Sequence, residues 1–192
     1  MTEVIRFAQP SDVGSILKMY APFILETAFA FERRVQSVEE FTARMEDVCV
    51  KHPFLVALVD DEVVGFTYSG AHKDRASYLF SVDVVVFVAP EHQSRDIGHR
   101  LFGCIMEILK ELGYHNVYSG CSLPNPWNIS LHESVGFTMI CVKSKCGYKF
   151  DEWRDVALME NIIGDHGENP ADPKSIKDLD AKKVADILSK YN

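Results

Sequence analysis

The sequence lacks the long apolar runs that a membrane-spanning helix requires. No stretch of about 18 uninterrupted apolar residues occurs in the chain of 192 residues. The opening residues are polar and contain no apolar core of the signal-peptide type, so we expect a cytoplasmic protein. The chain also has no internal repeat and no low-complexity segment. We therefore expect a globular protein with no membrane span.

An excess of basic residues is missing as well. The 20 Lys and Arg residues are outnumbered by 28 Asp and Glu residues, which gives a formal net charge of −8. Nucleic acids and anionic lipids bind to positive surface charge, so the overall charge predicts neither as a partner. With 47% hydrophobic residues, the chain has enough apolar side chains for one ordinary globular core.

The five cysteines lack the spacing of a metal site. They form no CxxC pair and have no matching histidine cluster, which favours reduced thiols and no bound metal. Cys141 and Cys146 lie close together in the sequence, but no second pair of ligands accompanies them. Packed or edge-strand thiols explain these residues better than metal ligands do.

The first half of the chain alternates between strand and helix patterns. VIRFA alternates like a strand, and Pro10-Ser11-Asp12 is a typical helix start. Residues 37–40, SVEE, have capping-box spacing and predict a second helix that runs to about Cys49. PFLVALV and VVGFTYSG, separated by Asp60-Asp61-Glu62, predict two strands joined by a tight turn.

The second half contains the most apolar strand and the clearest helix. The segment from Tyr78 to Val88 predicts a central strand that is buried on both faces. Apolar residues recur at helical spacing from Ile97, and Gly113 is a natural C-terminal stop. The remaining predicted elements are a strand at NVYSGCS, a short helix that ends at Gly136, and strands around 139–144 and 155–159.

The resulting order, β-α-α-β-β-β-α-β-α-β-β, indicates a mixed α/β sheet with helices on its faces. We expect this domain over residues 1–163. Residues 164–173 are rich in Gly, Pro, Asn and Asp and predict a linker. Residues 174–192 place apolar side chains on one helical face, which predicts an appended amphipathic helix docked on the domain or on a second subunit.

The junction between the central strand and the clearest helix has the chemistry of an anion site. VVVFVAPEHQSRDIG leads from a buried strand directly into the helix. The first N–H groups of a helix have no intrachain partner, and the helix dipole favours negative charge there. Such a turn can bind a pyrophosphate, although a helix start with one glycine is common and by itself a weak signal.

Several segments, in order along the chain, resemble the GNAT superfamily of N-acetyltransferases, in its phosphinothricin and methionine sulfone acetyltransferase branch. The resemblance extends from about Val4 to Asn161. The matching segments are TAFAFE at 27–32, RASY at 75–78, SVD at 81–83, the junction at 93–98, PN at 124–125, LHESVGF at 131–137, GYK at 147–149 and WRD at 153–155.

This resemblance implies a GNAT fold and a direct transfer of acetyl from acetyl-CoA to a small primary amine, without a metal. The implied acceptor is the α-amino group of a compound such as phosphinothricin, methionine sulfone or methionine sulfoximine. The implied assembly is a homodimer with the active sites near the interface. Because a fold and its motifs survive changes of substrate, the acceptor is the least secure of these expectations.

The resemblance also implies residues that bind acetyl-CoA. The coenzyme A loop pattern Gln/Arg-x-x-Gly-x-Gly/Ala fits the segment that begins at Gln93. Strand backbone groups would pair with the pantetheine amides and leave one N–H for the thioester oxyanion. The implied cofactor residues are Val86, Phe87, Val88, Gln93, Ser94, Arg95, Asp96, Ile97, Gly98 and Asn125.

Two residues are implied to transfer protons. An α-ammonium must lose a proton before it attacks a thioester, and the resemblance places the general base at Asp83, where the family more usually has Glu. A carboxylate hydrogen-bonded at a strand kink is the alternative interpretation of Asp83. His132 is implied to protonate the departing thiolate, although it could instead cap or pack the short helix.

Four residues are implied to form the acceptor pocket. A guanidinium suits carboxylate, sulfone or phosphinate oxygens, so Arg75 is the candidate for binding the acceptor's oxyanion. A solvated loop arginine is the alternative. Tyr78, Phe31 and Glu32 would complete the pocket, although Phe31 could equally be a core residue.

Two further departures from the family pattern bear on function. Asn128 stands where Ser is common, and Asp96 occupies the first glycine of the phosphate loop. A carboxylate near a pyrophosphate is repelled, so we expect Asp96 to point outward, paired with Arg95, Arg100 or a helix N–H. Asp96 also favours one rival function, a non-catalytic acyl-CoA-binding module. A second rival is acetylation of a peptide or ribosomal-protein N-terminus.

Overall fold

The computed structural model describes residues 2–192, apart from the side chain of Ser94. Seven strands form one sheet in the order β1-β2-β3-β4-β5-β7-β6. The strands are β1 Glu3–Phe7, β2 Phe54–Val59, β3 Glu62–Ala71, β4 Ser81–Val88, β5 Asn116–Ser122, β6 Thr138–Lys149 and β7 Glu152–Ile162. β4 and β5 are parallel, and the other neighbours are antiparallel. The predicted mixed α/β fold is confirmed.

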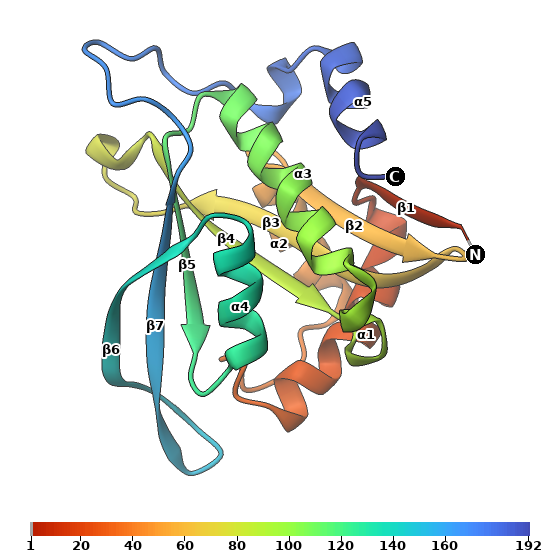
Figure 1. The fold of residues 1–192 in the computed structure, drawn as a ribbon. Coiled ribbons are helices and arrows are strands. Elements are labelled where there is room, and N and C mark those ends of the chain that lie inside the picture. Colours follow the sequence, from red (N-terminus) through yellow and green to blue (C-terminus); the bar gives the residue numbers. More distant parts are fainter. Residues whose placement is uncertain (1) are drawn as a thin grey trace.

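Helices cover both faces of this sheet (Figure 1). Side chains of α3 pack in one core, on the face that also carries α4, while those of α1 and α2 pack in a second core on the opposite face. The helices are α1 Val13–Glu26, α2 Val38–Val48, α3 Ile97–Leu112, α4 Pro126–Ser134 and α5 Ala181–Ser189. Local signals explain two of them. Ser37 and Glu40 form the predicted capping box of α2, and Gly113 ends α3 at φ 91°.

Two expectations about the central strand were wrong. β4 begins at Ser81, because residues Ala76–Tyr78 form the short 3-10 helix η2. The strand is also not buried on both faces. One face is buried in the core with α3, whereas Asp83, Val85 and Phe87 on the other face are only half-buried. Val85 and Phe87 line a cavity that the periodicity of a single segment does not reveal, and Asp83 shares their face of the strand.

The hairpin of β6 and β7 is longer than the sequence predicts. Its turn lies at Phe150 and Asp151, which both adopt positive φ. The same backbone geometry occurs at Asp60 and Asp61 between β2 and β3, as expected for tight hairpin turns. Most residues of β6 are exposed because the strand lies at the edge of the sheet, so the alternation that indicates a buried face is weak.

The two parallel strands separate soon after they begin. They pair only from Ser81 with Asn116 to Asp83 with Tyr118. Beyond that point β4 pairs only with β3, and β5 pairs only with β7. The result is a wedge-shaped opening in the middle of the sheet, between the second half of β4 and the second half of β5.

The C-terminal segment docks on the domain beside α3, and the two chain ends lie close together (Figure 1). The predicted appended helix is shorter than expected, since residues Ile176–Asp178 form a 3-10 turn before α5. Ile187 is buried, and the Tyr191 hydroxyl donates to Glu107 at 2.7 Å. No helix within residues 2–192 is both long and apolar enough to cross a membrane.

Candidate active site

A cavity of about 290 Å³, which we call the central cavity, lies where β4 and β5 separate. Its walls include Val85 of β4, Gly120 of β5 and the segment 29–32. A second cavity of about 190 Å³, which we call the loop cavity, is lined by Gln93 and Trp127 among others. Four wall residues are common to both, so the two cavities adjoin each other. The shared residues are Phe29, Val86, Phe87 and Asn128.

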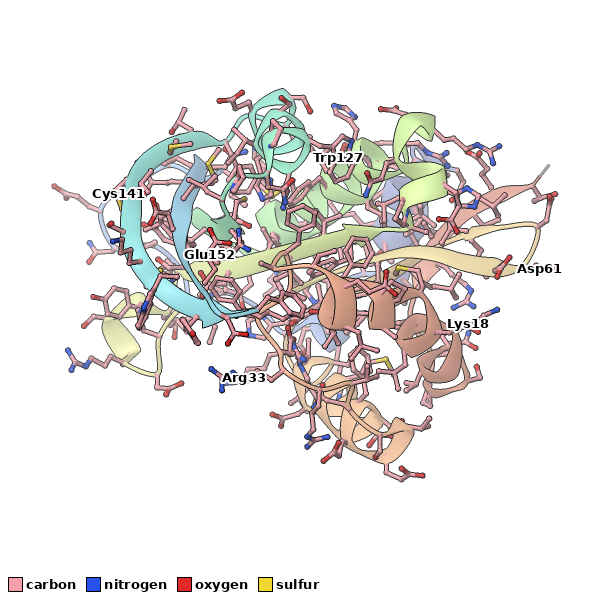
Figure 2. All side chains as sticks on the ribbon, turned by 90° about the horizontal axis from the view of Figure 1, so that it is seen from below. Lys18, Arg33, Asp61, Trp127, Cys141 and Glu152 are labelled. Atoms are coloured by element: carbon pink, nitrogen blue, oxygen red, sulfur yellow. The ribbon has the colours of Figure 1, made fainter. Side chains whose placement is uncertain are left out.

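The loop cavity ends at the turn between β4 and α3. Residues Pro90–Arg95 form a 3-10 helix, η3, and the Gln93 side chain donates to the Val88 carbonyl at 3.1 Å. Ile97 is buried in the core. A Cβ at Gly98 would lie only 2.9 Å from a terminal methyl of Leu131, so glycine lets this side chain of α4 approach closely. Trp127, labelled in Figure 2, lies beside this first turn of α3.

Asp96 occupies the backbone conformation that explains why glycine is common at its position. Its φ of 62° is left-handed, a region that Asp tolerates better than most residues. The side chain is 70% exposed and lies 4.0 Å from His99. Arg95 and Arg100, the expected partners of Asp96, both contact Glu3, at 3.1 and 2.5 Å. The side chain of Ser94 lies outside the described residues.

Asp83 lies on the cavity face of β4 and has a histidine partner that the sequence analysis missed. His72 Nδ1 is 2.7 Å from Asp83 Oδ1. The histidine ring lies 4.4 Å from the Tyr118 ring and 5.8 Å from the Tyr78 ring. Arg75 is exposed in the same loop and forms no ion pair with a described residue. The structure therefore groups Asp83 with Tyr78 but leaves Arg75 at the surface.

The wall opposite β5 carries a polar cluster. The Tyr20 hydroxyl donates to Glu32 at 3.0 Å, and Arg44 lies 3.6 Å from the same carboxylate. Arg44 also hydrogen-bonds to the Tyr68 hydroxyl. Burial and the Glu32 charge raise the pKa of Tyr20 above its usual range, so this phenol stays protonated. Tyr20, Arg44 and Tyr68 were missed because each fits the periodicity of its own helix or strand.

Phe31 lines the central cavity and also fixes the segment 29–32 against the hairpin of β6 and β7. A Cβ at Gly147 would collide with the Phe31 ring, so the two segments touch directly. Lys149 strengthens the contact by donating from Nζ to the carbonyls of Ile24 and Ala30, both at 2.6 Å. The GYK segment, noted in the sequence for its resemblance, therefore holds one wall of the cavity.

His132 is buried in the wall, with both ring nitrogens engaged. Nδ1 lies 2.7 Å from the Asn128 carbonyl and Nε2 lies 2.8 Å from the Ser119 hydroxyl. Burial lowers the pKa of His132 to about 4, so the ring is neutral at pH 7. A carbonyl can only accept, so Nδ1 carries the hydrogen and Nε2 accepts from Ser119. Both Ser119 and His132 line the central cavity.

Two asparagines at the start of α4 differ in their hydrogen bonding. The Asn125 side-chain oxygen accepts from the Asn128 N–H at 3.2 Å and caps the helix. The side-chain oxygen of Asn128 is buried without a hydrogen-bond partner, and the residue lines both cavities. The sequence analysis recorded Asn128 only as a departure from the family pattern.

Comparison with known proteins identifies the family. Residues 5–158 match the family described as the acetyltransferase (GNAT) domain. The chain belongs to the GNAT family. Since this family transfers acetyl groups and the matched relatives are named acetyltransferases, the protein is an acetyltransferase.

The relatives of this acetyltransferase lie in one branch. It is 28% identical to the phosphinothricin N-acetyltransferase of Streptomyces viridochromogenes, over 90% of this chain and 92% of that protein. It is also 28% identical to the L-methionine sulfoximine/L-methionine sulfone acetyltransferase of Salmonella typhimurium, over 84% and 95% of the two chains. The structure of a phosphinothricin acetyltransferase from Sinorhizobium meliloti in complex with AcCoA superposes with a TM-score of 0.86, at 26% identity over 93% and 98% of the two chains.

The cavities of this acetyltransferase fit acetyl-CoA at the level of chemistry. Beyond Asp83, one edge of β4 has no strand partner, so backbone groups of Val86, Phe87 and Val88 on that edge can pair with amides. The unpartnered Asn128 oxygen can accept from an amide N–H of the ligand. The open edge of β4 and the Asn128 oxygen would both be destabilising in a cavity without a ligand, because buried polar groups need hydrogen-bond partners.

Proposed function

We propose that this acetyltransferase transfers the acetyl group of acetyl-CoA to the α-amino group of a small amino-acid-like acceptor. The observation that carries the proposal is the central cavity, which lies between separated strands and adjoins the loop cavity. Its volume of about 290 Å³ suits a molecule of amino-acid size. The relatives named for phosphinothricin and methionine sulfoximine support the same acceptor class.

In this proposal the loop cavity receives the pantetheine arm and the turn before α3 binds the pyrophosphate. The N–H groups at the start of α3 supply the positive end of the helix dipole. Gln93 orders the turn through its bond to Val88, while the open edge of β4 and Asn125 and Asn128 at the start of α4 border the arm. The thioester then lies in the central cavity, where a backbone N–H of β4 can stabilise the oxyanion.

The proposed reaction is direct, through a tetrahedral intermediate. The proton-accepting group is built on Asp83, which has the family's position for a general base and lies on the cavity face of β4. His132 assists the protonation of the departing CoA thiolate. Because its ring is neutral and its Nδ1–H is bound to a carbonyl, His132 has no proton of its own to give. The Ser119 hydroxyl, oriented by Nε2, donates its proton to the sulfur and recovers one from the reacting amine.

Acceptor recognition is assigned to the opposite wall and the η2 loop. Glu32 is the charged side chain among the cavity's lining residues, and it suits the acceptor's ammonium. Phe31 and Tyr78 supply apolar contact near the acceptor. Arg75 is proposed to bind the acceptor's oxyanion, and its exposed position lets it reach a ligand that covers the cavity mouth.

We also propose a homodimer, because the β6 edge of the sheet is apolar and exposed. A flat apolar edge strand is an association surface unless something covers it. The exposed apolar residues of this hairpin are Met139, Ile140, Val142, Tyr148, Phe150, Trp153 and Ile162. Light scattering should report twice the chain mass, and Val142→Lys should reduce it to one chain.

The decisive experiment measures release of the CoA thiol from acetyl-CoA with a panel of acceptors. The panel contains phosphinothricin, methionine sulfone, methionine sulfoximine, ordinary amino acids and short peptides. Turnover restricted to the first three compounds is expected. Turnover on peptides would favour N-terminal acetylation, and acetyl-CoA binding without any turnover would favour a non-catalytic module.

A further inference from the structure

His72 and Asp83 form a hydrogen-bonded pair beside the central cavity. The 2.7 Å contact joins the Nδ1 atom of His72, just after β3, to Oδ1 of Asp83 on β4. The Tyr118 and Tyr78 rings contact the imidazole from β5 and η2. The His72 side chain is 17% exposed and the Asp83 side chain 49% exposed. The imidazole is therefore packed and oriented, whereas the carboxylate remains open to its surroundings.

The pair lies about two strand residues away from the side chains that line the cavity. Asp83, Val85 and Phe87 share one face of β4, and the last two line the cavity. On β5, Tyr118 stands opposite Asp83 and is followed two residues later by Gly120, which also lines it. Two residues along a strand span about 7 Å, so one water molecule can bridge the distance between the pair and a bound amine.

The geometry selects one tautomer of His72. An ionised carboxylate only accepts hydrogen bonds, so Nδ1 carries the hydrogen in the 2.7 Å contact. Nε2 then holds a lone pair. It has no hydrogen-bond partner within the part of the chain that the structure describes. A free, oriented Nε2 opposite a carboxylate-bound Nδ1–H is the arrangement of a histidine general base.

Base strength favours the imidazole over the carboxylate. In short peptides an imidazole binds a proton about 400-fold more tightly than an aspartate side chain. We propose that His72 Nε2 receives the proton of the acceptor's ammonium, directly or through one water, and that Asp83 orients His72. This assignment rests on the proposed function, because it needs an amine that must be deprotonated. It makes His72 the catalytic residue and Asp83 the positioning residue.

The proton balance is simple. One N–H bond of the ammonium breaks and its proton goes to Nε2, which leaves a neutral amine. The amine forms a C–N bond to the thioester carbon, and the C–S bond breaks. A second proton leaves the nitrogen and ends on the thiolate, while the imidazolium releases the first proton to solvent. An ammonium and acetyl-CoA thus give an amide, CoA thiol and one proton.

Within the described residues, the charged and titratable groups in contact with His72 come from three elements, and Lys73, Asp74 and Arg75 follow it in an exposed loop. Asp83 faces it from β4, Tyr118 from β5 and Tyr78 from η2. Glu160 of β7 reaches it only through Tyr118, whose pKa is raised mainly by burial and also by a hydrogen bond to that carboxylate. Asp83 is therefore the group that stabilises the imidazolium formed in the proton transfer.

Matched asparagine variants test the assignment by kinetics. His72→Asn keeps a donor in the place of Nδ1 but has no base, so we expect kcat to fall by about 10² to 10⁴ with KM for acetyl-CoA unchanged. Asp83→Asn should also reduce kcat, because the imidazole loses its orientation. His166→Asn, an exposed histidine near the start of β5, is the control and should behave as wild type. If His72→Asn stayed within about threefold of wild type while Asp83→Asn lost activity, the carboxylate would itself be the base.

Nitrogen NMR of the labelled full-length protein supplies a readout that needs no acceptor. The His72 signal, assigned by its loss in His72→Asn, should report the Nδ1–H tautomer in wild type. In Asp83→Asn the Nε2–H tautomer should gain population. A dominant Nε2–H tautomer in wild type would overturn the assignment. Absence of turnover with every acceptor would instead count against the proposed function, and the tautomer would still decide whether the pair is arranged as a base.

Discussion

The loop cavity and the central cavity lie next to each other but offer different chemical groups to a ligand. The loop cavity runs along the open edge of β4, where backbone N–H and C=O groups have no strand partner, and its other walls include η3 and the start of α4. The central cavity carries side chains from distant segments, including Glu32, Tyr68 and Ser119. Backbone groups do not depend on side-chain identity, so one cosubstrate can be retained while the acceptor changes. The comparison predicts that substitutions around the central cavity alter catalysis and acceptor choice, while those around the loop alter acetyl-CoA affinity.

Among the residues that the sequence singled out, the largest effect is expected from Asp83→Asn. Removing this carboxylate should lower kcat by about 10² to 10⁴, because the proton-accepting group is built on it. Acetyl-CoA binding, measured by calorimetry, should be nearly unchanged. Asp61→Asn, in the turn between β2 and β3 and labelled in Figure 2, is a control that keeps the charge change but lies in a remote hairpin. Activity of Asp83→Asn within about threefold of wild type from pH 6 to 9 would show that Asp83 takes no part in catalysis.

His132 tests the wall of the central cavity through stability. Burial lowers its pKa to about 4 from the ordinary 6.5, so the unfolded chain binds a proton in this window and the folded protein does not. Stability should therefore be full above pH 6.5 and fall by about 3 kcal/mol as the pH drops to 4. Urea unfolding of wild type and His132→Gln across this range measures the difference. Equal pH slopes in the two proteins would mean that His132 is hydrated.

Arg75→Ala should change the acceptor side alone. KM for acidic amino-acid acceptors should rise by about 10-fold to 100-fold, the value of a charged hydrogen bond, while KM for acetyl-CoA stays constant. Arg75→Lys should restore only part of the loss, because a forked contact is replaced by a single ammonium. Equal increases of both KM values would assign Arg75 a structural role and remove it from the acceptor site.

The smallest effect is expected at the loop cavity. Asp96→Asn should tighten acetyl-CoA by about threefold to tenfold at low salt, because an exposed carboxylate only weakly repels the pyrophosphate. The gain should shrink above about 0.15 M salt. Calorimetric titration at two salt concentrations measures it. Weaker binding by the variant would indicate that the carboxylate supports the loop, and failure of both proteins to bind would remove the cosubstrate from the proposal.

Much of the fold was predictable because its signals are local. The capping box at Ser37 and Glu40 needs only a spacing of three residues, and the helix from Ile97 to Gly113 needs only its own periodicity. The same locality explains the errors. The start of β4 was misplaced because the apolar residues of η2 continue the strand pattern, and the length of β6 was underestimated because an edge strand has no buried face.

Residues of the candidate site could be predicted from the sequence only where they belong to a recognisable motif. Gln93 and Gly98 were found by their loop pattern. The structure places Gln93 in η3, where it lines the loop cavity, and Gly98 in the first turn of α3. Phe31 and Glu32, which the resemblance assigns to an acceptor pocket, line the central cavity. Asn128 received no role, because a lone amide in a helix has no sequence signal. Only its burial without a partner reveals an acceptor that a ligand can satisfy.

The sequence alone was enough to predict the order of elements, the family and the position of the loop that we propose binds the pyrophosphate. These depend on patterns within single segments. The tertiary structure alone decided that His72 meets Asp83, that Arg44 meets Glu32 and that His132 is neutral. His72 and Asp83 are 11 residues apart, and they meet because β3 and β4 pair antiparallel in a particular register with Tyr118 alongside. Strand adjacency and register are set by packing of the whole domain, so the chemistry of the cavity emerges only when the chain is folded.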